Sequence, residues 1–307
     1  MYEFIKNNVE TSDKIFLDAP NRIPLSFNKL HQKLEKVRNN FDNLSINRSD
    51  PVAIVLPNGP DLGFLFIACS CFAISAPLNP NYSKNEFKFY LSDLKAKFLI
   101  VDPDLKTEAS KAAFELGITV INLSFEQNIG SLKLTKNNES SPITTINNYE
   151  KDTSLLLHTS GTTSKPKLVQ LSSNNLIKSS KNIGKTLYLN EEDSCLNIMP
   201  LFHIHGLVAV LLTSLVYNIK LVCTSGFNAL NFYKFLQDFK PSWYSGVLTM
   251  HQAILQRSKN NQDIIKNNPL RFIRSSSAPM PKPVLLEIEK TFNCPVIEAY
   301  GMTEASH

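Results

Sequence analysis

The stretch LLLHTSGTTSKPKLVQ, residues 155–170, decides the interpretation of this chain, because an apolar strand there runs into a loop suited to phosphate. The loop, residues 159–167, offers hydroxyls, backbone N–H groups and two lysine ammonium groups, and Gly161 lets the backbone turn close to an anion. It is not a Walker-type loop, since G-x-x-x-x-G-K-[ST] is absent and Lys167 follows a proline. A serine- and threonine-rich surface turn is the alternative interpretation of this segment taken alone.

Working outward from this loop, helical and strand patterns alternate along the chain. Apolar residues at helical spacing predict a helix over 27–42, which precedes an apolar strand at 52–56 and a buried helix at about 61–75. After the loop, a helix is predicted over 174–188, with its N-terminus near the bound anion. The alternation predicts an α/β fold with mostly parallel sheets covered by helices on both faces. The other predicted elements are helices at 85–97, 106–116, 207–217, 229–239, 249–257 and 281–292, and strands at 98–101, 118–123, 194–199, 220–224, 243–247 and 271–275.

Length and composition favour a soluble globular protein of one large or two medium domains. The chain has 307 residues, of which 43% are hydrophobic, and its net charge is +5. No block of arginine and lysine suggests a nucleic-acid surface, so no nucleic-acid partner is expected. Five cysteines without metal spacing indicate reduced thiols in an intracellular protein. They are Cys69, Cys71, Cys195, Cys223 and Cys294.

Two further segments bear on organisation. The uncharged stretch 62–78 is short and bracketed by Pro60 and Pro77, so a buried helix is favoured over a membrane span. Residues 126–150, rich in Asn, Ser, Thr and Lys, lack periodicity and are predicted to form a surface excursion before the phosphate loop.

Two later segments, PLFHIHG at 200–206 and YGMTE at 300–304, follow the phosphate loop in a recognisable order and spacing. Together the three segments resemble the signature of the adenylate-forming acyl-CoA synthetases, a superfamily that includes luciferases and peptide-synthetase adenylation domains. The resemblance covers nearly the whole chain, from the strand at Pro51 to the last residue. It implies that residues 1–307 form the large N-terminal AMP-binding domain of such enzymes, with two interlocked subdomains, and that this domain is incomplete at its C-terminal end.

The resemblance also implies roles for individual residues in binding ATP and Mg²⁺. Glu304 would be the magnesium ligand, Thr303 would contact the α-phosphate, and His203 would lie beside the reacting carboxylate, so these three are the candidate catalytic residues. A hard cation prefers carboxylate oxygen, which fits Glu304, although a solvated carboxylate at a helix start is the alternative. The expected nucleotide-binding residues are Thr159, Ser160, Gly161, Thr162, Thr163, Lys167, Ser277, Ala278, Pro279 and Tyr300.

Within this family, PLFHIHGL, RFIRSSSAPMP and EAYGMTEASH resemble the oxalate–CoA ligase branch. The position of His205 is usually aromatic or apolar in the family. A small dicarboxylate leaves its second carboxylate buried and in need of hydrogen-bond donors. The candidate donors are His205, Ser275, Ser276 and His307. For a single histidine, a hydrogen-bonded structural role is the alternative, and His31, His158 and His251 are given no function.

The activity implied is that of an AMP-forming acid–thiol ligase, which would convert a small carboxylate, expected to be oxalate, to an acyl adenylate and then transfer the acyl group to coenzyme A. The alternatives are a catalytically incompetent nucleotide- or carboxylate-binding protein and a ligase for a medium-chain or aromatic acid. In the family, a ribose-binding aspartate, a hinge and a catalytic lysine follow the position of His307, so the chain is interpreted as a fragment, a truncated gene model or half of a split enzyme. A cytoplasmic location is expected, or a peroxisomal one if a further C-terminal segment carries a targeting signal.

Overall fold

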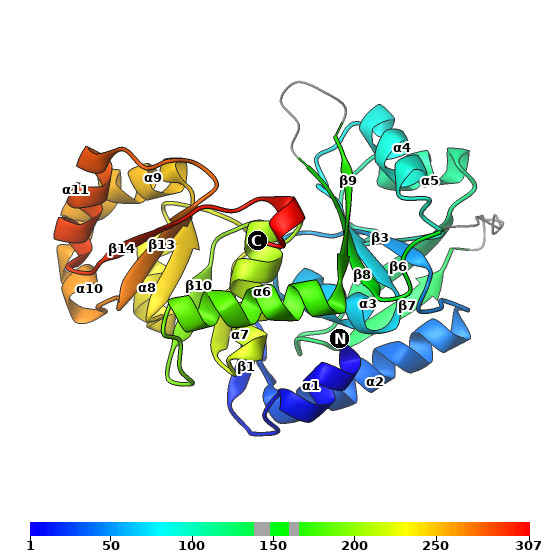
Figure 1. Cartoon of the computed structure of the whole chain (residues 1–307), viewed down its shortest axis with the longest axis horizontal. Coiled ribbons are helices and arrows are strands. Elements are labelled where there is room, and N and C mark those ends of the chain that lie inside the picture. The colour runs from blue at the N-terminus through cyan, green and yellow to red at the C-terminus, as the bar shows by residue number, and fades with distance from the viewer. Residues whose placement is uncertain (138–147, 160–165) are drawn as a thin grey trace.

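The computed structural model describes residues 1–137, 148–159 and 166–307, and its strands form two seven-stranded sheets with helices packed against them (Figure 1). Most neighbouring strands are parallel, as expected for strands joined by helical crossovers. The predicted α/β class with mostly parallel sheets is confirmed.

The first sheet has the order β7-β6-β5-β3-β4-β8-β9. Its parallel strands are β3 (Pro51–Val55), β4 (Ile74–Pro77), β5 (Phe98–Val101), β6 (Thr119–Phe125) and β8 (Thr153–His158). The edge strands β7 (Leu132–Lys136) and β9 (Leu168–Ser172) are antiparallel to their neighbours. The helices that accompany this sheet are α2 (Phe27–Asn43), α3 (Pro60–Phe72), α4 (Lys84–Asp93) and α5 (Ala109–Glu115).

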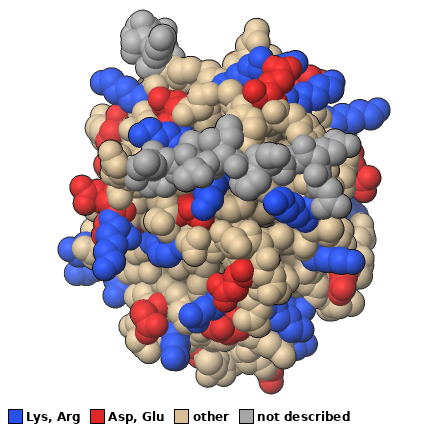
Figure 2. All heavy atoms as spheres, turned by 90° about the vertical axis from the view of Figure 1, so that its right-hand side faces the viewer, with Lys and Arg blue, Asp and Glu red and all other residues tan. Residues whose placement is uncertain are grey.

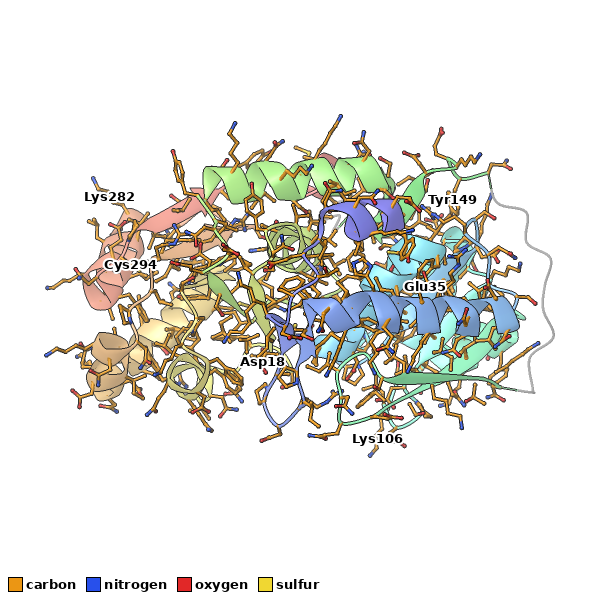
Figure 3. The ribbon with its side chains drawn as sticks, turned by 90° about the horizontal axis from the view of Figure 1, so that it is seen from below. Asp18, Glu35, Lys106, Tyr149, Lys282 and Cys294 are labelled. Atoms are coloured by element: carbon orange, nitrogen blue, oxygen red, sulfur yellow. The ribbon has the colours of Figure 1, made fainter. Side chains whose placement is uncertain are left out.

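The second sheet has the order β14-β13-β12-β10-β11-β1-β2. Its strands are β14 (Val296–Ala299), β13 (Phe272–Ser276), β12 (Trp243–Gly246), β10 (Ser194–Asn197), β11 (Lys220–Cys223), β1 (Ile15–Asp18) and β2 (Leu25–Ser26), of which β2 is antiparallel. Its helices are α8 (Phe232–Phe239), α9 (Leu248–Ser258), η2 (Lys259–Asn261), α10 (Gln262–Asn267) and α11 (Lys282–Phe292). Figure 3 shows Lys282 and Cys294 at this end of the elongated molecule, far from Tyr149.

The two halves are interlocked rather than consecutive along the chain. Strand β1 pairs with β11, so an N-terminal segment completes a sheet that is otherwise built from residues beyond 190. One apolar core runs between the sheets and includes Phe66 of α3 and Leu176 of α6 (Ser173–Thr186). Helix α6 lies across both halves (Figure 1), while α1 (Tyr2–Asn8) packs against α3.

The predicted helix at 61–75 is too long, because α3 ends at Phe72 and residues 74–77 form β4 beside β3. Every residue of α3 except Phe72 is buried, and so is all of β4, so no polar face marks the boundary between them. An apolar run without polar interruption cannot be divided into helix and strand from periodicity alone.

The expectation that the helix after the phosphate loop begins near the bound anion is wrong. Strand β9 intervenes, and it pairs antiparallel with β8 so that Ser172 lies opposite Thr153. The amide of Ser173 donates to the carbonyl of Asp152. Helix α6 therefore begins at the end of the β8–β9 ladder away from the loop.

The predicted helix at 207–217 begins as a π-helix, η1 (His205–Leu212), and continues as α7 (Thr213–Val216). A Cβ atom on Gly206 would collide with the carbonyl oxygen of Pro200, so only glycine allows the chain to fold back there. The side chain of Thr213 donates to the carbonyl of Val208, five residues earlier, at 2.8 Å. Wide turns of this kind are frequently found at functional sites.

The structure bears on the predictions about a membrane span, the cysteines, the surface excursion and the surface charge. Among the described residues, no helix is both long and apolar enough to cross a bilayer, and residues 62–78 are divided between α3 and β4. All five cysteines are buried free thiols. Of the predicted excursion at 126–150, residues 132–136 form the edge strand β7, and residues 138–147 lie outside the described residues. On the face shown in Figure 2, Lys and Arg side chains are interspersed with Asp and Glu.

Candidate active site

A cavity of about 790 Å³ lies where the carboxyl ends of strands from both sheets meet. The second sheet contributes residues that follow β10, β12 and β13, including His203, Val247 and Ser277. The first sheet contributes residues that follow β4 and residues at the end of β8, including Asn79 and Thr159. Ligands of parallel α/β sheets bind outside the carboxyl ends of the strands, so this cavity is the candidate active site.

The floor of the cavity is a buried polar cluster. His205, at the start of η1, places its Nε2 atom 2.6 Å from the hydroxyl of Ser245 and 2.9 Å from Nη1 of Arg274. The same guanidinium nitrogen lies 3.2 Å from the Ser245 hydroxyl, while Nδ1 of His205 lies 3.2 Å from the hydroxyl of Ser277. The solvent-exposed fractions of His205 and Arg274 are 4% and 2%.

The protonation of His205 follows from these neighbours. Burial, together with the adjacent Arg274 guanidinium, lowers the pKa of His205 to about 3, so the ring is neutral at pH 7. Because a guanidinium can only donate, Nε2 accepts from Arg274, and the ring hydrogen is on Nδ1. That N–H donates to Ser277. The expectation that His205 offers a free donor to the substrate is therefore not met in this arrangement.

Arg274 lies in the middle of β13 and has no carboxylate partner among the described residues. Burial lowers the pKa of its guanidinium to about 10, which leaves it charged at pH 7. Its Nε and Nη2 atoms make no hydrogen bond within the described part of the protein, and the side chain lines the cavity. A buried positive charge without an anion is costly, which favours the binding of an anionic group beside it.

The two ends of the phosphate loop are held together by the backbone. The amide of Thr159 donates to the carbonyl of Lys167 at 2.9 Å, and the amide of Lys167 donates to the Thr159 hydroxyl at 3.1 Å. Thr159 and the adjacent Pro166 line the cavity, and Lys167 is exposed. The remaining predicted phosphate contacts lie outside the described residues, and they are Ser160, Gly161, Thr162 and Thr163.

The last seven residues bring a second set of predicted residues to the cavity. Thr303 and Glu304, in the short helix η3 (Thr303–Ala305), both line it, and Glu304 is exposed and the only acidic residue among its described lining. His307 folds over Gly301, and its ring nitrogens lie 3.2 Å from the carbonyl of Tyr300 and 3.3 Å from that of Ala305. Its hydrogen-bonding capacity is thus directed at the main chain.

Other predicted residues are not brought to the cavity, or reach it with their donors occupied. Ser275 is buried, does not line the cavity, and points away from it because side chains alternate along β13. Ser276 lines the cavity but donates to the carbonyl of Ala299 at 2.9 Å. Three predicted adenine contacts are exposed and do not line the cavity, and they are Ala278, Pro279 and Tyr300. His203 lines the cavity and is exposed to it.

Sequence reasoning missed three polar residues near the cavity. Arg274 could have been noticed, because a charged residue in the middle of a predicted buried strand needs a partner or a ligand. Ser245 carried no signal. His158, at the end of β8, lines the cavity, with its Nε2 atom 2.8 Å from Asp93 and its buried Nδ1 without a described partner.

Comparison with known proteins places the chain in a family. The AMP-binding enzyme family matches residues 4–307. A protein named probable CoA ligase from Humulus lupulus is 38% identical over 292 residues, covering 92% of this chain and 55% of that protein. The oxalate–CoA ligase of Arabidopsis thaliana is 36% identical over 302 residues, covering 96% of this chain and 59% of that protein.

The fold agrees with that of a solved structure. ATP-bound MatB from Rhodopseudomonas palustris superposes with a TM-score of 0.83 at 21% identity, covering 99% of this chain and 59% of that one. The chain therefore spans a little over half the length of the relatives that it matches. The family match and the shared fold together show that this chain belongs to the AMP-binding enzymes, of which it contains the large N-terminal domain.

Proposed function

We propose that the full-length protein activates a small carboxylate with ATP, forming an acyl adenylate, and then transfers the acyl group to coenzyme A. The substrate proposed is oxalate. The observation that carries the proposal is the polar floor of the cavity, formed by the cluster of His205, Ser245 and Arg274. A fatty acid would need an apolar tunnel instead. The oxalate–CoA ligase of Arabidopsis among the relatives supports the same substrate.

The phosphates of ATP are proposed to bind between Thr303 on one side and Thr159 on the other, where the exposed Lys167 lies next to Thr159 outside the cavity lining. Glu304 offers the carboxylate that a hard dication needs, and one carboxylate suffices because Mg²⁺ takes its other ligands from phosphate and water. Among the described residues no group of three or more potential metal ligands is assembled. When bound, the cation would neutralise charge on the phosphates during pyrophosphate departure.

The reacting carboxylate is proposed to lie between His203 and the α-phosphate, with its other end toward the floor. His203 is exposed to the cavity and has no described side-chain hydrogen bond, so its ring is free to contact the substrate. Two negatively charged reactants must approach each other for adenylate formation, and donors fixed around them lower the barrier without reorganising.

The test is a substrate panel on the full-length protein. Pyrophosphate exchange and coenzyme A consumption would be measured with oxalate, malonate, acetate and octanoate at saturating ATP and Mg²⁺. Oxalate is expected to give the highest kcat/KM. Preference for octanoate would refute the oxalate proposal while leaving adenylate formation in place, and no exchange with any carboxylate would refute the ligase itself.

A further inference from the structure

The unused N–H groups of Arg274 are the feature from which the inference starts. A guanidinium has five donors, and the described residues occupy only those on Nη1, through His205 and Ser245. Both acceptors are neutral, so neither compensates the charge. By contrast, the neighbouring Arg271 forms an ion pair with Asp193, with an Nη2–Oδ2 distance of 2.7 Å.

The depth of Arg274 separates it from the residues proposed to bind phosphate. Its side chain is buried beside Ser245, which is fully buried, whereas Lys167 and Glu304 are exposed. A group that reaches Arg274 must therefore lie deeper in the protein than the exposed residues proposed to bind phosphate and magnesium. The carboxylate geometry matches a planar guanidinium, which binds two oxygens side by side.

We infer that Arg274 binds the non-reacting carboxylate of a dicarboxylate substrate and thereby selects dicarboxylates over monocarboxylates of similar size. This inference rests on the proposed function, since it assigns a residue to one end of the proposed substrate. His205 acts as a positioning residue, because its Nε2 atom accepts a hydrogen bond from Nη1 and so holds the guanidinium in place. The N–H groups on Nε and Nη2 are then left for the ligand.

The selectivity has a physical cause in the cost of leaving the buried charge unpaired. With oxalate, the guanidinium gains an anion and two charge-assisted hydrogen bonds. With acetate, a methyl group occupies the same place and the charge stays uncompensated. Sites built to hydrogen-bond a substrate group discriminate strongly against analogues that lack it.

The test compares Arg274→Met, which removes the charge at similar size, with Arg274→Lys, which retains the charge but loses the paired donors. The full-length protein would be assayed for kcat/KM with oxalate, malonate and acetate by pyrophosphate exchange, and for ATP affinity by calorimetry. Arg274→Met is expected to lose about 10²–10³-fold with oxalate, while acetate activity and ATP affinity change by no more than about threefold. Arg274→Lys is expected to recover part of the oxalate activity, and it keeps the test valid if Arg274→Met does not fold.

The matched control is Arg271→Met, which removes an arginine three residues away whose ion pair lies outside the cavity lining. It should lower the melting temperature and leave the oxalate-to-acetate ratio unchanged. Equal losses with oxalate and acetate, or weaker ATP binding, in both Arg274 variants would overturn the inference. Wild-type preference for malonate would refute oxalate but keep the role of Arg274, whereas wild-type preference for acetate or octanoate would refute both.

Discussion

The burial of a neutral His205 predicts a specific dependence of stability on pH. In the folded protein its pKa is about 3, against about 6.5 for an exposed histidine in the unfolded chain. Between these two values the unfolded state binds the proton and the folded state does not. The free energy of unfolding therefore falls as the pH is lowered through this window, and the stabilisation is fully present only above pH 6.5.

The magnitude follows from the window. The difference in bound protons between the two states is about one half at pH 6.5 and nearly one at pH 5, and a full proton is worth about 1.36 kcal/mol per pH unit. Summed from pH 7 to pH 5, His205 therefore contributes a loss of about 2 kcal/mol in the free energy of unfolding. The variant His205→Gln cannot take up this proton, but its amide oxygen can still accept from Arg274. Its unfolding free energy should therefore fall about 2 kcal/mol less than that of the wild type between pH 7 and pH 5.

The assay is urea unfolding at both pH values, followed by the fluorescence of Trp243. This residue is the single tryptophan of the chain, is fully buried in β12, and lies two positions from Ser245, so it reports the half of the protein that contains His205. Ser277→Ala serves as the control, because it removes the hydrogen-bond partner of Nδ1 without removing a titrating group. If His205→Gln and the wild type lose equal stability over this range, His205 is not buried in its neutral form.

Three other predictions test the phosphate site and the packing of α6. Lys167→Ala should weaken ATP binding about tenfold in calorimetry, through the loss of a charge-assisted contact, and unchanged affinity in the folded variant would exclude the loop as the phosphate site. Glu304→Gln keeps size but removes the charge that Mg²⁺ needs, so pyrophosphate exchange at saturating Mg²⁺ should fall about 100-fold, and a change of only a few-fold would refute the magnesium assignment. Gly184→Ala should lower the free energy of unfolding by about 1–3 kcal/mol, because a Cβ there would overlap the ring of Tyr217. Gly63→Ala, whose Cβ would make ordinary contacts, should stay within about 1 kcal/mol in the same urea titration, and equal effects of the two changes would contradict the packing of α6.

Local patterns of apolar residues in the sequence predicted many of the helices and strands. The apolar spacing in residues 27–42 predicted α2, whose buried residues include Leu30, Leu34 and Val37. The sequence could not indicate which distant strands pair, such as β1 with β11. Such pairings depend on tertiary contacts, and local sequence patterns carry no information about them. The antiparallel strand β9 was missed because its five residues follow a loop with no turn signal of the hairpin type.

In the candidate site, too, the sequence indicated some residues, whereas their hydrogen-bond roles depended on tertiary contacts. His205 was singled out from the sequence because a polar residue occupies a position where the family usually has an apolar one, and the structure places it in the cavity floor. Its role changed because hydrogen-bond direction depends on neighbours from β12 and β13, which are 40 and 69 residues away along the chain. The sequence already showed that Arg274 is a charged residue within a predicted buried strand. Its proposed role as an anion ligand, however, depended on the structure, in which no described carboxylate lies beside it.

Arg274 also borders a second cavity of about 530 Å³, beside α6 and β14, and His307 lines both. Two side chains, rather than continuous backbone, thus form part of the partition between the two spaces. Shortening either side chain would therefore enlarge the space between the two cavities without moving a strand, so single side chains rather than the sheet framework set the room available there.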